Sequence, residues 1–260
     1  MRGRRESQRR EFIRLFLTYL VPLILLTAFF LLQHHWITAE SRRLHLLSIA
    51  ETQANTLDLF LRERVANVSN LIHDPELPLP ASSDALAHGL ARLKRDSTSF
   101  VDVGCFDSSG KQVAYSGPFP ALEHRDYGEE PWFTKLKGQP KGFIITDTYL
   151  GFRGKPHFTI AVSRVVSGKY YVVRATLDPQ EIYEYVTTLK GSSEVVTYIV
   201  NRGGGYQLAP AQMDGAIDES SAVPPSTPTT GTHSGSGAAT HGLYAHSWLQ
   251  TADWAVTWVV

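Results

Sequence analysis

The hydrophobic pattern at the start of the chain predicts one long helix that passes through two different surroundings. Eighteen consecutive uncharged residues run from Leu15 to Leu32, and from Thr38 to about Ile72 apolar residues recur every three or four positions. At a rise of about 1.5 Å per residue the first run reaches about 27 Å, close to the thickness of a bilayer's hydrocarbon core. We therefore expect a transmembrane helix over 15–33 that continues into a long helix over 38–75.

The apolar positions of the second segment form a single stripe along the helix. Pro75, Pro78 and Pro80 end this helix. The sequence leaves two partners for the stripe open: the rest of its own chain, or a second copy of the same helix in a homodimer. The stripe consists of Leu47, Ala50, Ala54, Leu57, Leu61, Val65, Val68 and Ile72.

The pattern after residue 96 alternates with a period of two and predicts strands. Strands are expected at 100–106, 112–115, 143–149, 156–166 and 170–177, and again at 195–200, 206–208, 244–249 and 254–260. Short helices are expected at 84–95, 129–136 and 178–189. This order predicts an α+β fold with two antiparallel lobes, over 76–180 and 181–260.

One segment of the second lobe lacks the apolar residues that a core requires. Residues 211–241 are rich in Pro, Ser, Thr, Gly and Ala. Such a composition cannot bury enough apolar surface to offset the entropy of ordering. We expect a mobile, disordered loop at 211–241.

The distribution of positive charge predicts the orientation of the N-terminal helix in the membrane. Arg2, Arg4, Arg5, Arg9 and Arg10 all precede the apolar run. Because positive charge is retained on the cytoplasmic side, residues 1–14 are expected in the cytoplasm, next to anionic membrane lipid, and residues after 33 outside a bacterial inner membrane. A cleaved secretory signal is the alternative, although its apolar region is usually shorter, about 7 to 15 residues. The zero net charge of the whole chain indicates no nucleic-acid surface.

The chain carries none of the sequence motifs of common catalytic or metal sites. It has no Gly-x-Ser-x-Gly, His-Glu-x-x-His or Cys-x-x-Cys motif, and its ten histidines lack ligand spacing. We expect no cofactor, no metal and no catalytic residue. Cys105 is the only cysteine, so the chain has no internal disulfide, and its apolar neighbours predict a buried structural thiol.

The central stretch from Tyr127 to Arg174 is distinctive. It contains Tyr-Gly-Glu-Glu-Pro-Trp-Phe at 127–133, Thr-Asp-Thr-Tyr-Leu-Gly-Phe-Arg-Gly-Lys-Pro-His-Phe at 146–158 and Val-Arg-Ala-Thr at 173–176. These residues resemble the ligand-binding lobe of double Cache domains, the extracytoplasmic sensors of bacterial histidine kinases and chemoreceptors. The order of elements, with a membrane span, a long helix and two lobes, is similar as well.

The resemblance implies two PAS-like lobes, of which 76–180 is membrane-distal and ligand-binding and 181–260 is membrane-proximal. It implies a sensor that signals through the helix at 38–75 to a cytoplasmic histidine kinase of a two-component system. The alternatives are a chemotaxis receptor, a cyclic-dinucleotide-signalling protein or a non-sensing structural module. Amino-acid-binding members place an arginine before the Trp-aromatic pair and an aspartate late in the last strand, whereas this chain has Glu130 and Thr176 there. The expected ligand is a small organic acid or similar metabolite.

Strand alternation locates the expected pocket. His157, Thr159 and Ala161 share one face, Arg174 shares a face with Thr176, and Asp147 with Tyr149. Such polar faces either meet water or, if aromatic residues cover them, line a small-molecule site. Arg174, with His157 if protonated, suits a carboxylate, and Arg153 between two glycines is expected to support a turn. The expected ligand-binding residues are Tyr127, Trp132, Phe133, Asp147, Tyr149, His157 and Arg174.

Overall fold

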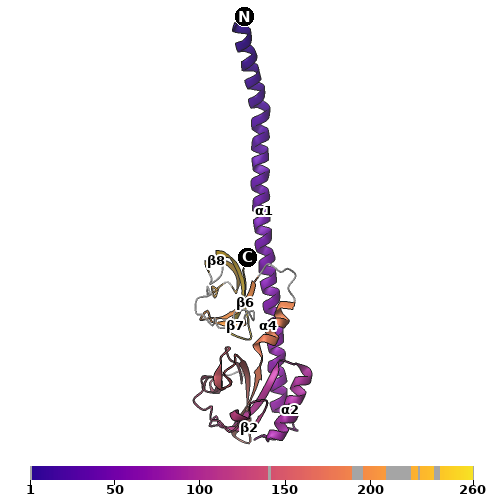
Figure 1. Cartoon of the computed structure of the whole chain (residues 1–260), viewed down its shortest axis with the longest axis vertical. Coiled ribbons are helices and arrows are strands. Elements are labelled where there is room, and N and C mark those ends of the chain that lie inside the picture. The colour runs from indigo at the N-terminus through magenta and orange to yellow at the C-terminus, as the bar shows by residue number, and fades with distance from the viewer. Residues whose placement is uncertain are drawn as a thin grey trace. The chain divides into compact units, whose positions relative to one another are not determined.

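The structure is a computed structural model of the chain, which describes residues 2–139, 142–188, 196–208, 224–227, 229–236 and 241–259. Internal contacts divide it into two compact units, Met1–Ser48 and Ile49–Val260. Helix α1, Arg2–His73, contributes to both units (Figure 1). The continuous helix expected from the sequence is thus confirmed, and it ends just before Pro75.

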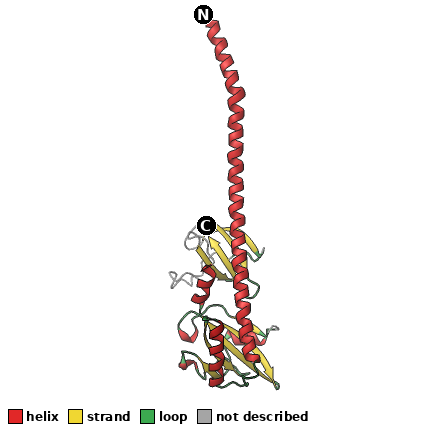
Figure 2. Ribbon diagram, turned by 90° about the vertical axis from the view of Figure 1, so that its right-hand side faces the viewer, coloured by secondary structure: helices red, strands yellow, loops and turns green. Residues whose placement is uncertain are grey.

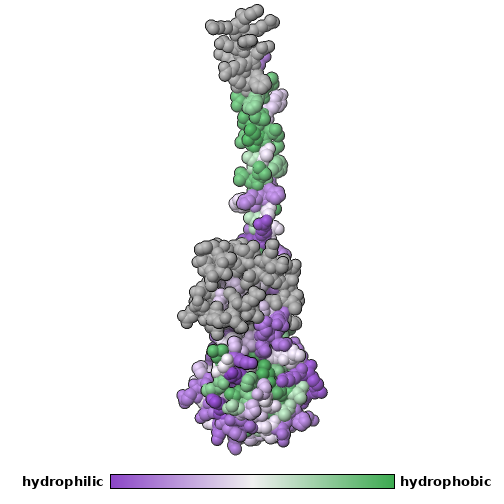
Figure 3. All heavy atoms as spheres, in the orientation of Figure 1, coloured by the Kyte–Doolittle hydropathy of each residue, from purple (hydrophilic) through white to green (hydrophobic). Residues whose placement is uncertain are grey.

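The first unit exposes a broad apolar surface. Large side chains from Leu15 to Leu32 are uncovered, among them Leu25 at 65% and Phe30 at 58% exposure. In Figure 3 apolar residues cover the visible side of this helical segment. Its most apolar stretch has a mean hydropathy of 2.5, so α1 is long and apolar enough to cross a membrane. Length and composition of this kind fit a membrane anchor and a signal sequence alike.

The first five strands form one antiparallel sheet in the order β2-β1-β5-β4-β3. Figure 2 shows the strands of the protein in yellow. Helix α2 packs on β1 and β2, and α3 on β3 and β4. The elements of this first lobe are α2 Ser83–Asp96, β1 Phe100–Phe106, β2 Gln112–Ser116, the 3-10 turn η1 Pro120–Leu122, α3 Pro131–Lys137, β3 Phe143–Ile145, the 3-10 turn η2 Gly151–Arg153, β4 Phe158–Val166 and β5 Lys169–Leu177.

The next five strands form a second antiparallel sheet in the order β7-β6-β10-β9-β8. Counted along the chain, this is the same order as in the first sheet, so the two lobes are topological repeats. The elements of the second lobe are α4 Pro179–Thr188, β6 Val196–Asn201, β7 Tyr206–Leu208, β8 Thr230–Ser236, β9 His241–Trp248 and β10 Trp254–Val259. The α+β class with two antiparallel lobes is confirmed.

Two expectations about local structure were wrong. Strand β8, Thr230–Ser236, lies within the segment 211–241 that we expected to be mobile, and it pairs with β9 from Thr230↔Ser247 to Ser236↔His241. Pairing along β9 supplies the backbone hydrogen bonds that composition alone does not predict. Residues 209–223, 228 and 237–240 lie outside the described residues. Strand β3 ends at Ile145 rather than Tyr149, because Asp147 and Thr148 bond to the second lobe.

The register of the first sheet separates an apolar face from a polar one. Val103, Ala175 and Ile160 lie opposite one another on the apolar face. One step along, Gly104, Arg174 and Ala161 form a row on the other face, next to a row of Asp102, Thr176 and Thr159. The alternation predicted for these strands is therefore confirmed. Cys105 is fully buried, and burial raises the pKa of its thiol.

The stripe of α1 packs within its own chain. Ala50, Ala54, Leu57, Leu61 and Ile72 are all at most 2% exposed. This settles the question that the sequence left open for these positions, since a stripe buried inside the chain is not free to contact a second copy.

Polar contacts fix α1 to the turn between β9 and β10. The Asp58 carboxylate, 6% exposed, accepts hydrogen bonds of 2.8 Å from the backbone N–H groups of Gln250 and Thr251. Arg62 donates to the side chains of the same two residues. The turn is thereby attached to the helix at two successive backbone groups.

Asp58→Ala should lower the free energy of unfolding by about 2 kcal/mol, because two backbone donors lose their acceptor. Urea unfolding of the chain in detergent, followed by tryptophan fluorescence, measures it. Glu51→Ala, at an exposed position of the same helix, is the control and should change the stability by less than about 0.5 kcal/mol. Equal effects of the two substitutions would contradict the attachment.

Candidate functional site

Helix α3 covers the polar face of the first sheet. Pro131 occupies its first turn, where a missing N–H costs nothing, and Glu130 is the N-cap residue. The helix turns Trp132, Phe133 and Leu136 inward, and all three are buried. The sequence hypothesis that Trp132 and Phe133 cover this face agrees with the structure.

An arginine enclosed by aromatic rings lies between helix α3 and the sheet. The guanidinium carbon of Arg174 is 5.0 Å from the ring centroid of Phe106, 4.6 Å from that of Tyr127 and 4.9 Å from that of Trp132. The three rings also contact one another edge-on or tilted, with centroids 5.1 to 6.1 Å apart. We call these three rings and the Arg174 guanidinium the aromatic cage. Arg174 itself is only 2% exposed.

A second buried arginine lies beside the cage. The 3-10 turn η2 begins at Gly151 and is followed by Gly154, both with positive φ, and it carries Arg153. Its guanidinium binds both oxygens of Asp102 at 2.7 Å and donates to the Thr176 hydroxyl at 2.8 Å. Asp102 is 1% exposed. A buried carboxylate is tolerated here because its charge is paired and hydrogen-bonded.

His157 completes this cluster as a neutral side chain. Its Nε2 accepts from Arg153 at 2.7 Å, since a guanidinium only donates, and its Nδ1 therefore carries the proton and donates to the carbonyl of Lys155 at 2.8 Å. Burial, helped by the two neighbouring arginines, lowers the pKa of His157 to about 4. The sequence left the charge of His157 open, and these contacts favour the neutral form at neutral pH.

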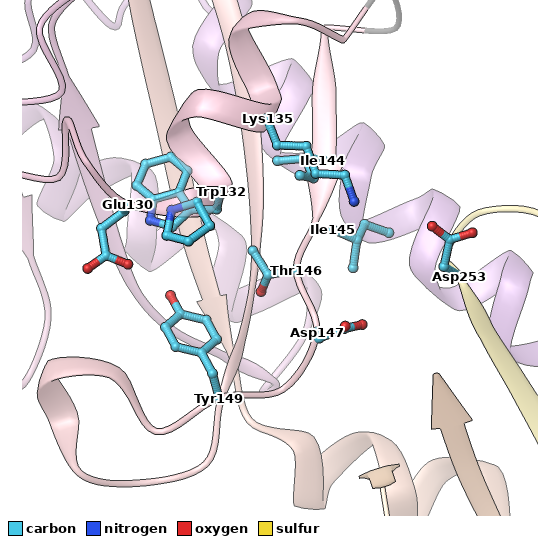
Figure 4. Close-up of a pocket in the computed structure, with 10 residues that line it drawn as sticks. Glu130, Trp132, Lys135, Ile144, Ile145, Thr146, Asp147, Tyr149 and Asp253 are labelled. Carbon is cyan, nitrogen blue, oxygen red and sulfur yellow. The ribbon is translucent and has the colours of Figure 1, made fainter. Parts of the chain in front are cut away.

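An open cavity of about 370 Å³ lies on the other side of Trp132. Figure 4 shows Tyr149 directing its hydroxyl toward Trp132 and Glu130, while the Asp147 carboxylate turns toward Asp253 of the β9–β10 turn. The size is at the lower end of small-molecule sites, about 300 to 1,000 Å³. The cavity is lined by Glu130, Pro131, Trp132, Lys135, Ile144, Ile145, Thr146, Asp147, Tyr149 and Asp253.

The seven expected ligand-binding residues fall into two groups. Trp132, Asp147 and Tyr149 line the cavity. The four others do not line it. Tyr127 and Phe133 pack with Trp132, Arg174 lies in the cage, and the His157 ring lies tilted against Tyr149 with ring centroids 4.4 Å apart. Trp132 connects the two groups, because it lines the cavity and its ring also contacts the Arg174 guanidinium.

Unlike the other expected ligand-binding residues, Asp147 forms hydrogen bonds to the second lobe. Its two carboxylate oxygens accept from Trp254 Nε1 at 2.9 Å and Asn201 Nδ2 at 3.0 Å, both in the second lobe. Next to it, Thr148 bonds to Gln207 through its backbone N–H and through its hydroxyl. This corner of the site therefore joins the two lobes.

The sequence reasoning missed three contributors. Arg153 does lie in a turn, as expected, but its guanidinium enters the buried cluster. Asp102 was not singled out, although an aspartate in the middle of an apolar strand is itself a signal, since such carboxylates are almost always paired when buried. Glu130 was noted only as a departure from the family pattern, and it lines the cavity.

The neutral His157 predicts a pH-dependent stability. Because its folded-state pKa lies below its ordinary value of 6.5, the folded chain binds fewer protons, so its stability is fully present above about pH 6.5 and declines toward pH 4. Between pH 7.5 and 5 the loss should be on the order of 2 kcal/mol. Urea unfolding at several pH values measures it.

The His157→Gln variant should flatten this part of the profile, whereas His88→Gln, at an exposed position, should leave it unchanged. A His157→Gln profile as steep as that of the parent chain would show that another group titrates.

Comparisons place this arrangement among known folds. No family model and no curated protein sequence matches the chain. Solved structures do match. The ligand-binding domain of the chemoreceptor CtaA of Pseudomonas fluorescens, in complex with L-isoleucine, has a TM-score of 0.64 at 17% identity, over 87% of this chain and 95% of its own. That of the amino-acid chemoreceptor PctB of Pseudomonas aeruginosa PAO1, in complex with L-Gln, has a TM-score of 0.62 at 17% identity, over 83% and 89%.

The extracellular domain of the putative histidine kinase rpHK1S-Z16 matches as well, with a TM-score of 0.64 at 14% identity, over 85% of this chain and 94% of its own. An extracellular ligand-binding receptor from Desulfohalobium retbaense matches over 82% of this chain, which spans only 40% of that receptor. The chain therefore has the two-lobed fold of the extracellular ligand-binding domains of chemoreceptors and a histidine kinase, in agreement with the double Cache fold implied by the sequence resemblance.

Proposed function

We propose that this chain is a membrane-anchored extracytoplasmic sensor that binds a small molecule in its first lobe. The observation that carries the proposal is the cavity of about 370 Å³ beside Trp132, which combines apolar and aromatic walls with polar and charged side chains. Its position in a lobe with the fold of known ligand-binding domains supports the same conclusion. The domain division of the proposal is an anchor at 15–33, a signalling helix at 38–75, a distal lobe at 76–180 and a proximal lobe at 181–260.

The anchor and its direction belong to the proposal. The exposed apolar segment of α1 and the arginines before it favour an uncleaved helix in a bacterial inner membrane, with residues 1–14 in the cytoplasm and both lobes outside. As the signalling output we propose a cytoplasmic histidine kinase, and a chemotaxis receptor is the alternative, since the structural neighbours include both classes.

A continuous set of contacts connects the cavity with the helix. Asp147 lines the cavity and accepts from Trp254, the first residue of β10. The turn before β10 is the segment that Asp58 of α1 holds, and Trp258 in the same strand donates to Gln53 of α1 at 2.6 Å. A ligand that favours one position of this turn would thereby favour one arrangement of α1, which is the differential affinity that signalling requires.

A homodimer through α1 also stays a proposal. Because the stripe residues are buried within the chain, such a dimer would use another side of the helix, where Leu44 and Leu59 are 56% and 69% exposed.

A ligand screen tests the sensor function. Organic acids, amines, amino acids and sugars are added to the chain in detergent, and its melting temperature is followed by tryptophan fluorescence. One compound class should give a saturable rise, because a ligand that binds only the folded state stabilises it. Tyr149→Ala should weaken the apparent affinity at least tenfold, whereas the exposed neighbour Leu150, which does not line the cavity, serves as the control in Leu150→Ala. No saturable rise with any class would favour a structural module.

A second experiment tests the connection to α1. Trp254→Phe keeps a ring against Phe158 but removes the donor to Asp147. In the parent chain, a saturating ligand should change amide hydrogen exchange in residues 49–73, and in Trp254→Phe this change should shrink while the affinity changes less than about threefold. Unchanged exchange of α1 in the parent chain at saturation would contradict the proposed route.

A further inference from the structure

An open groove runs along one face of α1 where the apolar run ends. It has a volume of about 440 Å³ and lies within the first unit, Met1–Ser48. Its lining positions recur every three or four residues, which places them on one side of the helix, and they extend over about 16 Å of its axis. The groove is lined by Leu31, His34, His35, Thr38, Ala39 and Arg42.

Side-chain size and direction create this groove. The short side chain of Ala39 leaves a hollow between His35, one turn earlier, and Arg42, one turn later. Side chains on a helix lean toward its N-terminal end, so the Arg42 side chain extends back over Ala39 toward the apolar run. The Thr38 hydroxyl donates to the carbonyl of His34 at 2.8 Å and lies 3.2 Å from Nδ1 of the same residue. This contact holds the His34 ring at the edge of the groove.

The polarity of the lining changes in one direction along the groove. Leu31, at one end, is 67% exposed and belongs to the apolar run Leu15–Leu32. Two exposed histidines follow, and the exposed Arg42 lies at the other end. A phospholipid has the same order of polarity, with an acyl chain followed by a charged headgroup.

Arg42 carries a charge that the chain leaves uncompensated. Among the residues that the structure describes, no ion pair or hydrogen bond involves Arg42, whereas Nη1 of the adjacent Arg43 lies 3.1 Å from Oε1 of Glu40. An exposed arginine in water needs no partner. Close to a bilayer surface, however, a basic side chain attracts anionic headgroups.

The position of the groove along α1 matches the headgroup layer of a bilayer. A hydrocarbon core of about 30 Å corresponds to about twenty helical residues, so a span that begins at Leu15 ends near His34. Arg42 then lies about 12 Å further along the axis, beyond a headgroup layer that is about 5 to 8 Å thick. Because a long basic side chain extends back to the membrane interface, the Arg42 guanidinium reaches this layer.

We propose that this groove binds an anionic phospholipid of the outer leaflet, with an acyl chain along Leu31 and the phosphate between Arg42 and the two histidines. This inference rests on the proposed uncleaved membrane anchor. A phosphate accepts hydrogen bonds from the forked donors of a guanidinium and from imidazole N–H groups. The apolar end favours a lipid over free phosphate, because an inorganic anion has no group to place against Leu31. A lipid bound on one face holds the helix at one rotation in the bilayer.

Fluorescence quenching by brominated lipids tests the proposal. Trp36 is 80% exposed and lies one turn before Ala39, so its indole reports on the lipids beside the groove. The chain is incorporated into vesicles of dioleoylphosphatidylcholine and dioleoylphosphatidylglycerol, with one of the two lipids brominated at a time. The Trp36 signal is the difference between the parent chain and Trp36→Phe. Phosphatidylglycerol should be enriched about fivefold next to Trp36, the factor expected for one arginine near an anionic surface.

Neighbouring arginines provide a matched pair of variants. Arg42→Gln should lower the enrichment about fivefold, and Arg42→Lys should retain most of it, because the charge is kept. Arg43→Gln removes the same charge from a residue that pairs with Glu40 and does not line the groove, so it should change the enrichment less than about twofold. Both positions are exposed, and the melting temperature of each variant should equal that of the parent chain.

Three outcomes would overturn the lipid site and leave the anchor in place. Both brominated lipids could quench Trp36 equally, or the enrichment could be as high in Arg42→Gln as in Arg43→Gln. Inorganic phosphate could remove the enrichment at an ionic strength at which chloride does not, which would indicate a site for free anions. No quenching of Trp36 by either brominated lipid would contradict the anchor itself, and the lipid site with it.

Discussion

The ion pair between Arg153 and Asp102 determines the chemistry of the first lobe. It neutralises a carboxylate that is 1% exposed and holds the turn η2 against the sheet. Because Arg153 binds both oxygens of Asp102 and the Nε2 of His157, the second arginine, Arg174, contacts aromatic faces and no described carboxylate. The polarity of the site therefore follows from one pairing, and a ligand that competed for Asp102 would first have to break a buried, bidentate ion pair.

The sequence predicted most of the framework because its signals are periodic. Apolar stripes and alternating strands require no knowledge of distant contacts, so α1, the first sheet and the division of its faces could be inferred from residues close in the chain. Strand β8 could not. Its Thr-, Gly- and Ser-rich sequence has little preference of its own, and it becomes a strand by pairing with β9. The repeat of the two lobes was implied by the resemblance to double Cache domains and not by the periodic pattern, since topology can repeat without a repeat in sequence.

The candidate site was predictable in part for the same reason. Trp132, Tyr149 and Arg174 carry local signals, an aromatic pair at the start of a helix and polar positions within apolar strands. The role of Arg153 depends on a partner 51 positions earlier in the chain, and no local pattern announces such a pair. Asp147 lies on the other side of the strand end, because the backbone after Ile145 leaves the sheet and bonds to the second lobe. Asp147, the acidic residue of the expected site, therefore lies at the junction of the two lobes.

The central claim is that the cavity beside Trp132 binds a small molecule. Nuclear magnetic resonance of the chain labelled with ¹⁵N at tryptophan Nε1 observes this wall of the cavity directly, and the signal is assigned by its loss in Trp132→Phe. We expect the Trp132 Nε1–H resonance to move progressively and saturably when a stabilising compound is added, with the resonance of the exposed Trp36 staying in place. A resonance that stays in place while the ligand saturates the chain would contradict it.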